Sequence, residues 1–452
     1  MKTIDDIAAE LAGYDPKALN VDMVNRFLSQ LVEPVTETEA VDIFQALGRV
    51  LAHDITSPLS VPPHDNSAMD GYAFDGAQLL ASAPLVLQVV GTALAGQAWQ
   101  GEVNAGECVK IMTGAIMPKG LDTVVPQEFV TEGVDDFGKS CITLPAGLLR
   151  KGDNRRKRGE DLMEGQPALL KGELLTPAAL GLVASLGIDK LTVLRKLRVA
   201  YFSTGNEILS LGDAPREGAV FDSNRYTVFG LLSRLGCEVL DLGVVADEPD
   251  ALEAAFVSAA ERSDAIITSG GVSVGEADYT KAMMKKLGDV AFWKIAMRPG
   301  RPMAVGQLFR SKLAASPYVS GEAHYAIDST LSNTGKAILF GLPGNPVAVM
   351  VTFLAFVRPA LRQMMGANAA PLPLLKARSL EAIRKKPGRT EYQRGCVSTS
   401  TQGALWVNTT GNQGSGVLSS MVQANGLIVL HHDQGNVAAG DEVDVMMFDG
   451  AI

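Results

Sequence analysis

Short apolar runs alternate with amphipathic stretches through the middle of the chain, from about residue 197 to residue 365. The runs have the length of buried strands, and the stretches between them repeat apolar residues at helical spacing. This alternation is typical of a doubly wound sheet with helices on both faces. The expected strands are residues 199–202, 238–242, 265–268, 290–295, 303–305 and 338–340, and the expected helices are residues 225–235, 249–262, 279–287 and 346–364.

The segments on either side follow other patterns. Residues 1–20 are mixed and Asp-rich, so we expect a loose lead-in, followed by helices at about 22–32 and about 39–48. Between residues 85 and 149, short alternating runs broken by glycine predict a β-rich module. From about residue 372 to the end the chain is β-rich again.

These patterns predict a multidomain α/β protein. A doubly wound α/β domain at 197–366 is flanked by an N-terminal α+β region at 1–196 and a small, barrel-like β domain at 370–452. The β-rich module is inserted into the N-terminal, linker-helical region at about 58–162. Residues 309–336 are rich in Ser, Ala and Gly without a periodic pattern, and we interpret them as a long surface loop.

Two glycine-containing loops follow strands of the α/β region. Ser269-Gly270-Gly271 lies between an apolar strand and a helix, and residues 341–346 follow another strand. In a doubly wound sheet, ligands bind outside the carboxyl ends of the strands, where glycines let backbone N–H groups approach an anion. An isolated Gly-Gly loop is more simply a tight turn, but two such loops in one unit favour a binding site.

Charged side chains belong to the same predicted edge. Those that follow the strands are Glu207, Asp247, Lys294, Arg298 and Arg301. Glu276 and Asp278 come directly after the Gly-Gly loop. Two carboxylates beside an anion site are consistent with a divalent cation between them.

Three further polar segments allow two interpretations each. Residues 65–72 offer oxygen ligands or simply Asx-type turns, and both remain open. The four cations 155–158 are usually a solvated surface, although they could form a phosphate clamp. Residues 409–415 could face a ligand, but a polar turn is the favoured interpretation.

Composition narrows the class of protein. The net charge of −10 argues against a broad nucleic-acid-binding surface, so an anion site has to be local. We expect no membrane span, and the start of the chain lacks the layout of a signal peptide. The four cysteines are far apart, as in reduced cytoplasmic proteins, and the five histidines lie outside the polar motifs described above.

Taken together, the motifs resemble the molybdopterin molybdenumtransferase family, the molybdenum-cofactor insertases that include the E domain of gephyrin. The resemblance runs from about residue 35 to the C-terminus. It rests on an ordered set of motifs, at residues 65–72, 111–115, 158–161, 202–207, 269–278 and 341–346.

The resemblance implies the last step of molybdenum cofactor synthesis. Adenylylated molybdopterin and molybdate would give molybdenum cofactor and AMP, with Mg²⁺ as the usual divalent cation. It also implies a homodimer in which the loop at 65–72 acts on the α/β domain of the other subunit. A molybdopterin adenylyltransferase and apo-molybdoenzymes are implied as partners, while nucleic acid and membranes are not.

The resemblance also implies roles for individual residues. The catalytic set would be Asp70, Glu207, Asp247, Asp278 and Lys294, with Asp247 and Asp278 as the Mg²⁺ ligands. Substrate or anion contacts would come from Thr113, Arg156, Asp161, Ser269, Gly270, Gly271, Arg298, Arg301, Pro343 and Ser415. Cleavage of a phosphoanhydride requires charge neutralisation on its oxygens, which a metal and cations supply.

The chain departs from the family pattern at two places. The family often has lysine where this chain has Arg298 and Arg301, and arginine is a planar fork instead of a point charge. The segment 309–336 is also longer than the family usually shows. Two alternative functions remain: a molybdopterin adenylyltransferase, whose single α/β domain is similar, and a non-catalytic scaffold of the gephyrin type.

Overall fold

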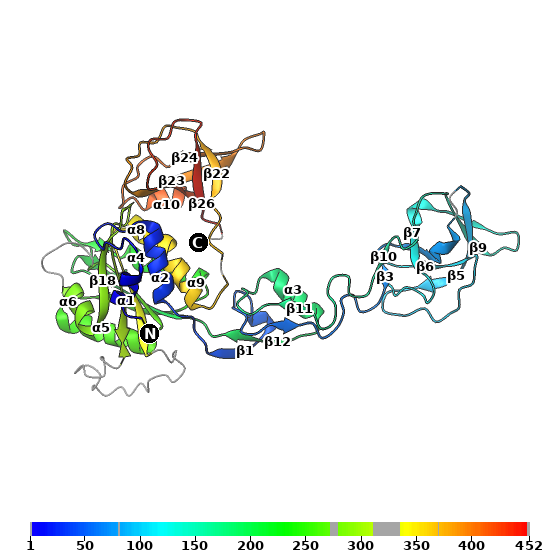
Figure 1. Cartoon of the computed structure of the whole chain (residues 1–452), viewed down its shortest axis with the longest axis horizontal. Coiled ribbons are helices and arrows are strands. Elements are labelled where there is room, and N and C mark those ends of the chain that lie inside the picture. The colour runs from blue at the N-terminus through cyan, green and yellow to red at the C-terminus, as the bar shows by residue number, and fades with distance from the viewer. Residues whose placement is uncertain (1, 80–81, 272–278, 311–334, 369, 450–452) are drawn as a thin grey trace.

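The computed structural model describes residues 2–79, 82–271, 279–310, 335–368 and 370–449. The molecule is elongated (Figure 1). The α/β domain and the C-terminal β domain lie at one end, and the β-rich module lies at the other. A narrow linker domain connects the two ends, so residues of the module are far from the α/β domain of the same chain.

The N-terminal segment is helical from its start. Helix α1 (Ile4–Glu10) begins with a capping box, in which the side chains of Thr3 and Asp6 accept reciprocal backbone N–H groups. Helix α2 (Val21–Leu31) follows, and its apolar face packs into the core of the α/β domain. The expectation of a loose lead-in is therefore wrong, because α1 also buries Ile4 and Ile7 in that core.

The linker domain is built from two short strand pairs and one helix. Strand β1 (Thr38–Asp42) pairs with β12 (Lys190–Leu194), and β2 (Ile55–Thr56) pairs with β11 (Pro167–Leu169), both antiparallel. Helix α3 (Pro177–Ser185) starts at the N-cap Thr176, whose hydroxyl accepts the N–H of Ala179.

The helix expected at 39–48 is not formed. The chain there makes β1 and the short 3-10 helix η1 (Ile43–Gln45). Three apolar residues at helical spacing suggested a helix, but only Val41 is buried, while Phe44 is 92% exposed and Leu47 is 55% exposed. Pairing with β12 therefore outweighs the local pattern.

The β-rich module contains a six-stranded sheet in the order β7-β4-β6-β5-β9-β8. Its strands are β4 (Gly71–Phe74), β5 (Leu85–Ala93), β6 (Glu107–Ile111), β7 (Thr123–Pro126), β8 (Thr131–Val134) and β9 (Ser140–Leu144). A separate pair joins β3 (Asn66–Ser67) to β10 (Arg155–Arg156). Part of the segment interpreted as a loop is thus β4, which is buried throughout.

The α/β domain contains a six-stranded sheet in the order β16-β13-β17-β21-β20-β18. The strands are β13 (Arg198–Thr204), β16 (Glu238–Val245), β17 (Ala265–Ser269), β18 (Gly288–Lys294), β20 (Pro302–Phe309) and β21 (Lys336–Leu342). The helices are α4 (Ser223–Arg234), α5 (Pro249–Arg262), α6 (Tyr279–Leu287), α8 (Pro346–Thr352) and α9 (Arg358–Met364), with a π-helical turn η5 (Phe353–Val357) between the last two.

Strands β16, β13, β17 and β21 pair in parallel, and β20 runs antiparallel to both of its neighbours, so β18 runs in the same direction as those four. Successive residues of β13 belong to different core clusters: Tyr201 packs with α4 and α8, whereas Phe202 packs with α5 and α6. The sheet is therefore covered by helices on both faces, which confirms the predicted doubly wound fold.

One helical stretch of the described residues, Pro346–Met364, is long and apolar enough by composition to cross a membrane. Its most apolar 18 residues are 78% buried inside the structure. From the sequence we expected no membrane span. Its burial against α2 and the sheet identifies it as a central core helix.

The C-terminal domain is a closed barrel of five strands: β22 (Leu375–Ser379), β23 (Thr390–Thr399), β24 (Leu405–Thr409), β25 (Gly426–Leu430) and β26 (Glu442–Met447). The order is β23-β24-β22-β26-β25, and β25 pairs back onto β23. Closure leaves none of these strands as an open edge. The short helix α10 (Ser419–Gln423) packs beside β23.

A buried ion pair fixes the start of the sheet. Arg195 donates to both carboxylate oxygens of Asp264, at 2.7 and 2.9 Å, and lies 3.4 Å from Glu37. Arg195 is 9% exposed and Asp264 is 3% exposed, so water screens this pair very little.

Asp264→Ala should lower the free energy of unfolding by about 3–5 kcal/mol, because it leaves a buried guanidinium without its main partner. Urea unfolding followed by circular dichroism measures this loss. Glu238→Ala removes a carboxylate that pairs with Arg198 but is 61% exposed, and we expect a loss of about 0–1 kcal/mol. Equal losses in the two variants would contradict the assignment of Asp264 as a buried anchor.

Candidate functional site

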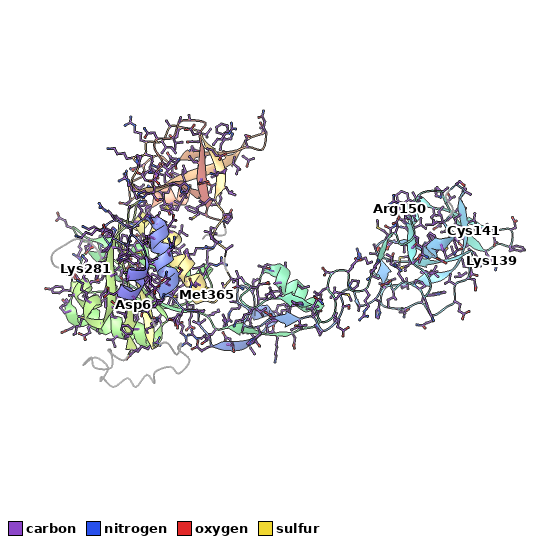
Figure 2. All side chains as sticks on the ribbon, viewed as in Figure 1. Asp6, Lys139, Cys141, Arg150, Lys281 and Met365 are labelled. Atoms are coloured by element: carbon purple, nitrogen blue, oxygen red, sulfur yellow. The ribbon has the colours of Figure 1, made fainter. Side chains whose placement is uncertain are left out.

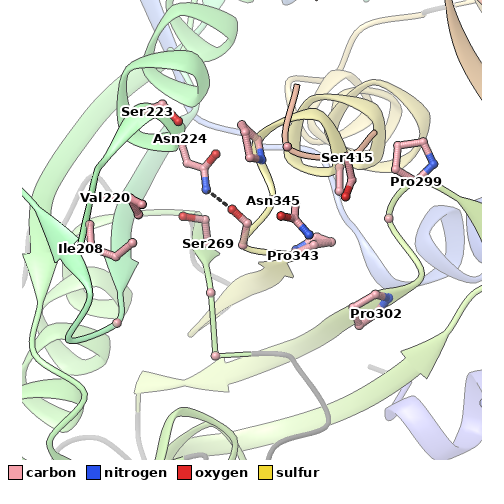
Figure 3. A pocket seen from close by; sticks show the side chains of 18 of the residues that line it. Ile208, Val220, Ser223, Asn224, Ser269, Pro299, Pro302, Pro343, Asn345 and Ser415 are labelled. Atoms are coloured by element: carbon pink, nitrogen blue, oxygen red, sulfur yellow. Dashed lines mark hydrogen bonds between the residues drawn. The ribbon is translucent and has the colours of Figure 1, made fainter. Parts of the chain in front are cut away.

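A cavity of about 970 Å³ lies at the carboxyl ends of β13, β17 and β21 (Figure 3). Its walls come from three regions that are distant in sequence: the strand ends of the α/β domain, the segment 297–302, and loops of the C-terminal barrel. Predicted site residues that line it are Glu207, Asp247, Ser269, Gly270, Gly271, Arg298, Arg301, Pro343 and Ser415.

The Gly-Gly loop is shaped by close backbone contacts. Gly270 has φ +93°, and a Cβ there would lie 2.4 Å from the carbonyl oxygen of Thr204. The Gly270 N–H donates to the carbonyl of Leu342 at 3.2 Å, so it is used within the protein. Gly270 therefore lets the loop pass close to its neighbours, and it does not offer the N–H that was expected for an anion.

The hydroxyl of Ser269 belongs to a buried triangle beneath the cavity. It lies 2.7 Å from the phenol oxygen of Tyr201 and 3.2 Å from the hydroxyl of Ser203, and the other side measures 2.8 Å. Burial raises the pKa of Tyr201, so the phenol stays protonated. The triangle holds the end of β17 against β13, and Ser269 acts through its position in the cavity floor.

A side-chain bond joins the start of α4 to the second glycine loop. Asn224 Nδ2 donates to the carbonyl of Gly344 at 2.7 Å, as the dashed line in Figure 3 shows. Asp222 caps the same helix by accepting the N–H of Arg225. Together they fix the loop that carries Pro343 beside the end of β17.

Arginines gather on the side of the cavity formed by the C-terminal domain. Strand β19 (Met297–Arg298) follows the α/β strand β18 but pairs in parallel with β23 of the barrel, which places Arg298 opposite Glu391. Arg389 also lines the cavity, and its Nε and Nη2 lie 2.8 Å from Glu391 Oε1. Arg298, Arg301 and Arg389 therefore make this wall cationic.

A fourth arginine supports this wall from behind. Arg394 is fully buried and donates to the Ser420 hydroxyl and to the carbonyls of Asn412 and Gly414. Burial lowers its pKa, and the charge of Arg298 lowers it further. Arg394 thus fixes the loop that brings Gln413 and Ser415 into the cavity, and its positive charge lies close to that of Arg298.

Acidic side chains occupy the opposite side. Glu207 follows β13 and Asp247 follows β16, at the other end of the sheet from β20. The described residues contain no group of three or more His, Cys, Asp or Glu side chains that could hold a metal. Mg²⁺ commonly uses only one or two carboxylates with water and substrate phosphates, so Glu207 and Asp247 suit such an ion.

A second polar cluster forms in the β-rich module, at the far end of the molecule (Figure 1). Asp70 Oδ1 accepts both the N–H and the hydroxyl of Thr113, each at 2.7 Å. Strand β10, which contains Arg156, pairs with β3 next to this loop, and the N–H of Asp161 bonds to Val61. The module therefore carries Asp70, Thr113, Arg156 and Asp161, and it holds Asp70 and Thr113 in direct contact.

Three family profiles match successive parts of the chain. The MoeA N-terminal region (domain I and II) matches residues 19–187, a probable molybdopterin binding domain matches 200–363, and the MoeA C-terminal region (domain IV) matches 376–448. The molybdopterin molybdenumtransferase of Haemophilus influenzae is 40% identical over 425 residues, which span 94% of this chain and 97% of that protein. This chain belongs to the molybdopterin molybdenumtransferase family.

Other comparisons agree with that membership. The molybdopterin molybdenumtransferase of a Nostoc species is 32% identical over 415 residues, 91% of this chain and 88% of that protein. The crystal structure of a molybdopterin biosynthesis MoeA protein from Pyrococcus horikosii superposes with a TM-score of 0.69 at 28% identity, covering 96% of this chain and 99% of that one. The predicted family, the enzyme class and the multidomain fold are confirmed.

Some residues that the family resemblance suggested lie elsewhere. Lys294, at the end of β18, is exposed and is not among the cavity-lining residues. Asp278 and Glu276 lie outside the described residues, as does most of the segment 309–336. Asp70, Thr113, Arg156 and Asp161 are in the module, away from the cavity of their own chain.

Sequence reasoning missed several cavity residues. Asn224, Arg389 and Gln413 were not singled out as site residues, although all three line the cavity. Asp222-Ser223-Asn224 after a glycine turn was a usable signal. The loop at 409–415 was favoured as a plain turn, whereas Gln413 and Ser415 line the cavity wall.

The Asp70–Thr113 contact gives a test of the module's local structure. The two bonds, first from the N–H and then from the hydroxyl, lower the pKa of Asp70 below its ordinary value of 3.8. The bonds form with the carboxylate, so they persist at neutral pH and weaken as pH falls through the lowered pKa. Thr113→Val should raise this pKa part of the way back, because the N–H remains. Carboxyl ¹³C NMR titration measures the shift, and an unchanged pKa would contradict the contact.

Proposed function

We propose that this enzyme inserts molybdate into adenylylated molybdopterin and releases AMP, with Mg²⁺, as the final step of molybdenum cofactor biosynthesis. The observation that carries the proposal is the polarity of the cavity. Carboxylates stand on one side and three arginines on the other. This distribution suits a substrate that combines a phosphoanhydride with an oxyanion.

The arginine wall supplies fixed positive charge for molybdate and phosphate oxygens. Guanidinium groups bind such oxyanions through two parallel N–H bonds. Arg298 is held by the pairing of β19 with β23, and Arg389 is held by the buried Glu391, so these two groups are positioned before a ligand arrives. Positioned donors stabilise charge as it develops, without the cost of reorganisation.

The carboxylate wall would hold the divalent cation. Asp247 would be a ligand together with Asp278, the pair that we proposed from the sequence, and Glu207 lines the same wall as Asp247. The cation, when bound, would neutralise charge on the anhydride oxygens.

We further infer a homodimer with a composite site. The module carries Asp70, Thr113, Arg156 and Asp161 at the far end of the chain, and these polar groups can complete a cavity only in another subunit. We place the enzyme in the cytoplasm, with a molybdopterin adenylyltransferase as supplier of the substrate and apo-molybdoenzymes as recipients of the product.

The decisive experiment mixes purified protein with adenylylated molybdopterin, Mg²⁺ and molybdate. We expect AMP release and reconstitution of an apo-molybdoenzyme, and both should require molybdate. A parallel reaction with molybdopterin and Mg-ATP distinguishes the adenylyltransferase alternative, which alone predicts an adenylylated product there. A protein that binds the substrate but releases no AMP under either condition would be a scaffold, and the proposal would fail.

A further inference from the structure

A second cavity, of about 430 Å³, lies where the linker domain meets the α/β domain. Its walls come from residues 47–49 of the linker, from the C-terminal end of α4, and from α9 with the residues after it. Met365, which lines this cavity, lies on the side of the α/β domain that faces the linker (Figure 2). We call the first cavity, at the carboxyl ends of β13, β17 and β21, the polarised cavity. The two cavities share no lining residue.

The lining of the second cavity is strongly cationic. Its charged residues are Arg49, Lys196, Arg234, Arg358 and Arg362, and no described lining residue is acidic. Arg49 is already engaged, since it pairs with Glu39 and donates to the carbonyl of Leu194. Lys196, Arg234 and Arg362 form no salt bridge with the residues that the structure describes, although the protein as a whole carries a net charge of −10.

Two of these cations stand one helical turn apart on the same helix. Arg358 and Arg362 are at positions i and i+4 of α9, where like charges repel. Arg358 is 5% exposed, and burial followed by the charge of Arg362 lowers its pKa to about 10. A bound anion would offset this repulsion.

The cations in this cavity are not needed to cap the C-terminal end of α4. The carbonyls of Leu231, Leu232 and Ser233 accept the backbone N–H groups of Leu235, Cys237 and Gly236 at 3.2, 3.1 and 3.0 Å. Gly236, with φ +81°, makes this closure possible. The last turn of α4 thus satisfies these carbonyls with its own backbone, and the cations remain available to a ligand.

We propose that this second cavity binds a small molecule that carries phosphate groups. Lys196, Arg234 and Arg362 would contact the phosphate oxygens, as clustered cations do in other phosphate sites. Leu231, Leu235 and Met365 line the same cavity and would contact an uncharged part of the ligand. Because the walls belong to two domains, the ligand would also hold the linker at a fixed angle to the α/β domain.

Calorimetric titration with inorganic pyrophosphate tests the proposal. Wild-type protein should show two sites per chain, one in each cavity. The double variant Arg234→Gln/Arg362→Gln should lose the second site, with its Kd raised at least about tenfold, and keep the first. The double variant Arg298→Gln/Arg301→Gln should lose the first site and keep the second. Arg26→Gln, an exposed arginine on α2 that lines neither cavity, should keep both.

A parallel titration with AMP distinguishes the two sources of the phosphate group. A site that is lost for both probes in Arg234→Gln/Arg362→Gln identifies a nucleotide-type ligand, and a loss for pyrophosphate alone identifies an inorganic polyphosphate. Lys196→Gln, an exposed change, serves as a second variant with the same expected direction. A single wild-type pyrophosphate site that disappears in Arg298→Gln/Arg301→Gln would overturn the inference, as would two sites that persist in the first variant. Neither result bears on AMP release by the polarised cavity.

Discussion

An equal mixture of Asp70→Ala and Asp247→Ala subunits should recover about a quarter of wild-type activity, although each variant alone should be inactive. Asp70 and the cavity lie at opposite ends of one chain, so the proposed composite site takes its two parts from different subunits. Random pairing makes half of the dimers mixed, and each mixed dimer contains one intact site. AMP release after co-expression or joint refolding measures the recovery.

A matched control uses two changes in the same cavity. Asp247→Ala mixed with Arg301→Ala should show no recovery, because both residues line the same cavity and each α/β domain in the mixture carries one of the two defects. If Asp70 acted within its own chain, the mixture of Asp70→Ala with Asp247→Ala would stay inactive. That result would rule out the composite site while leaving the proposed reaction open.

Arg301→Gln should lower the rate of AMP release by about a hundredfold, the usual effect of removing one positioned donor to developing charge. Arg301 is exposed to the cavity and stands on its cationic wall. Arg301→Lys should retain much more activity, because it keeps the charge and loses only the planar fork. Single-turnover rates with saturating molybdate separate this effect from weaker binding.

The comparison of Arg301→Gln with Arg301→Lys also distinguishes a loss of charge from a disturbance of packing. Both substitutions remove the guanidinium, so a loss caused by packing should be similar in the two variants. A large loss in Arg301→Gln together with recovery in Arg301→Lys would identify charge as the property that matters. Equal activity in Arg301→Gln and wild type would contradict the role of this wall.

The α/β domain was predictable because its signals are local. Buried parallel strands give continuous apolar runs, and the expected helices at 249–262 and 279–287 match α5 and α6 residue for residue. The helix prediction for residues 39–48 failed because the deciding signal is not local. Its three apolar residues fit a helix, but the strand with which the segment pairs lies about 150 residues later in the chain.

The site was predictable only where its residues follow strands of the same sheet. Glu207, Asp247 and the glycines could be placed at one edge by topology alone. Arg389 and Gln413 reach the cavity because a different domain packs there, and no pattern around them indicates that approach. Lys294 shows the converse, since it is the last residue of β18 in the same sheet and still lies outside the cavity lining.

The pairing of β19 with β23 has a consequence for how molecules enter and leave. The N–H of Thr390 bonds to Ala296, and the N–H of Val347 bonds to Ser415, so main-chain bonds stitch the barrel to the α/β domain on both sides of the arginines. A rotation of the barrel away from the α/β domain would break these hydrogen bonds. We therefore expect substrate to enter and product to leave past Glu207 and Asp247. Among the described residues, no interdomain backbone hydrogen bond closes that side of the cavity.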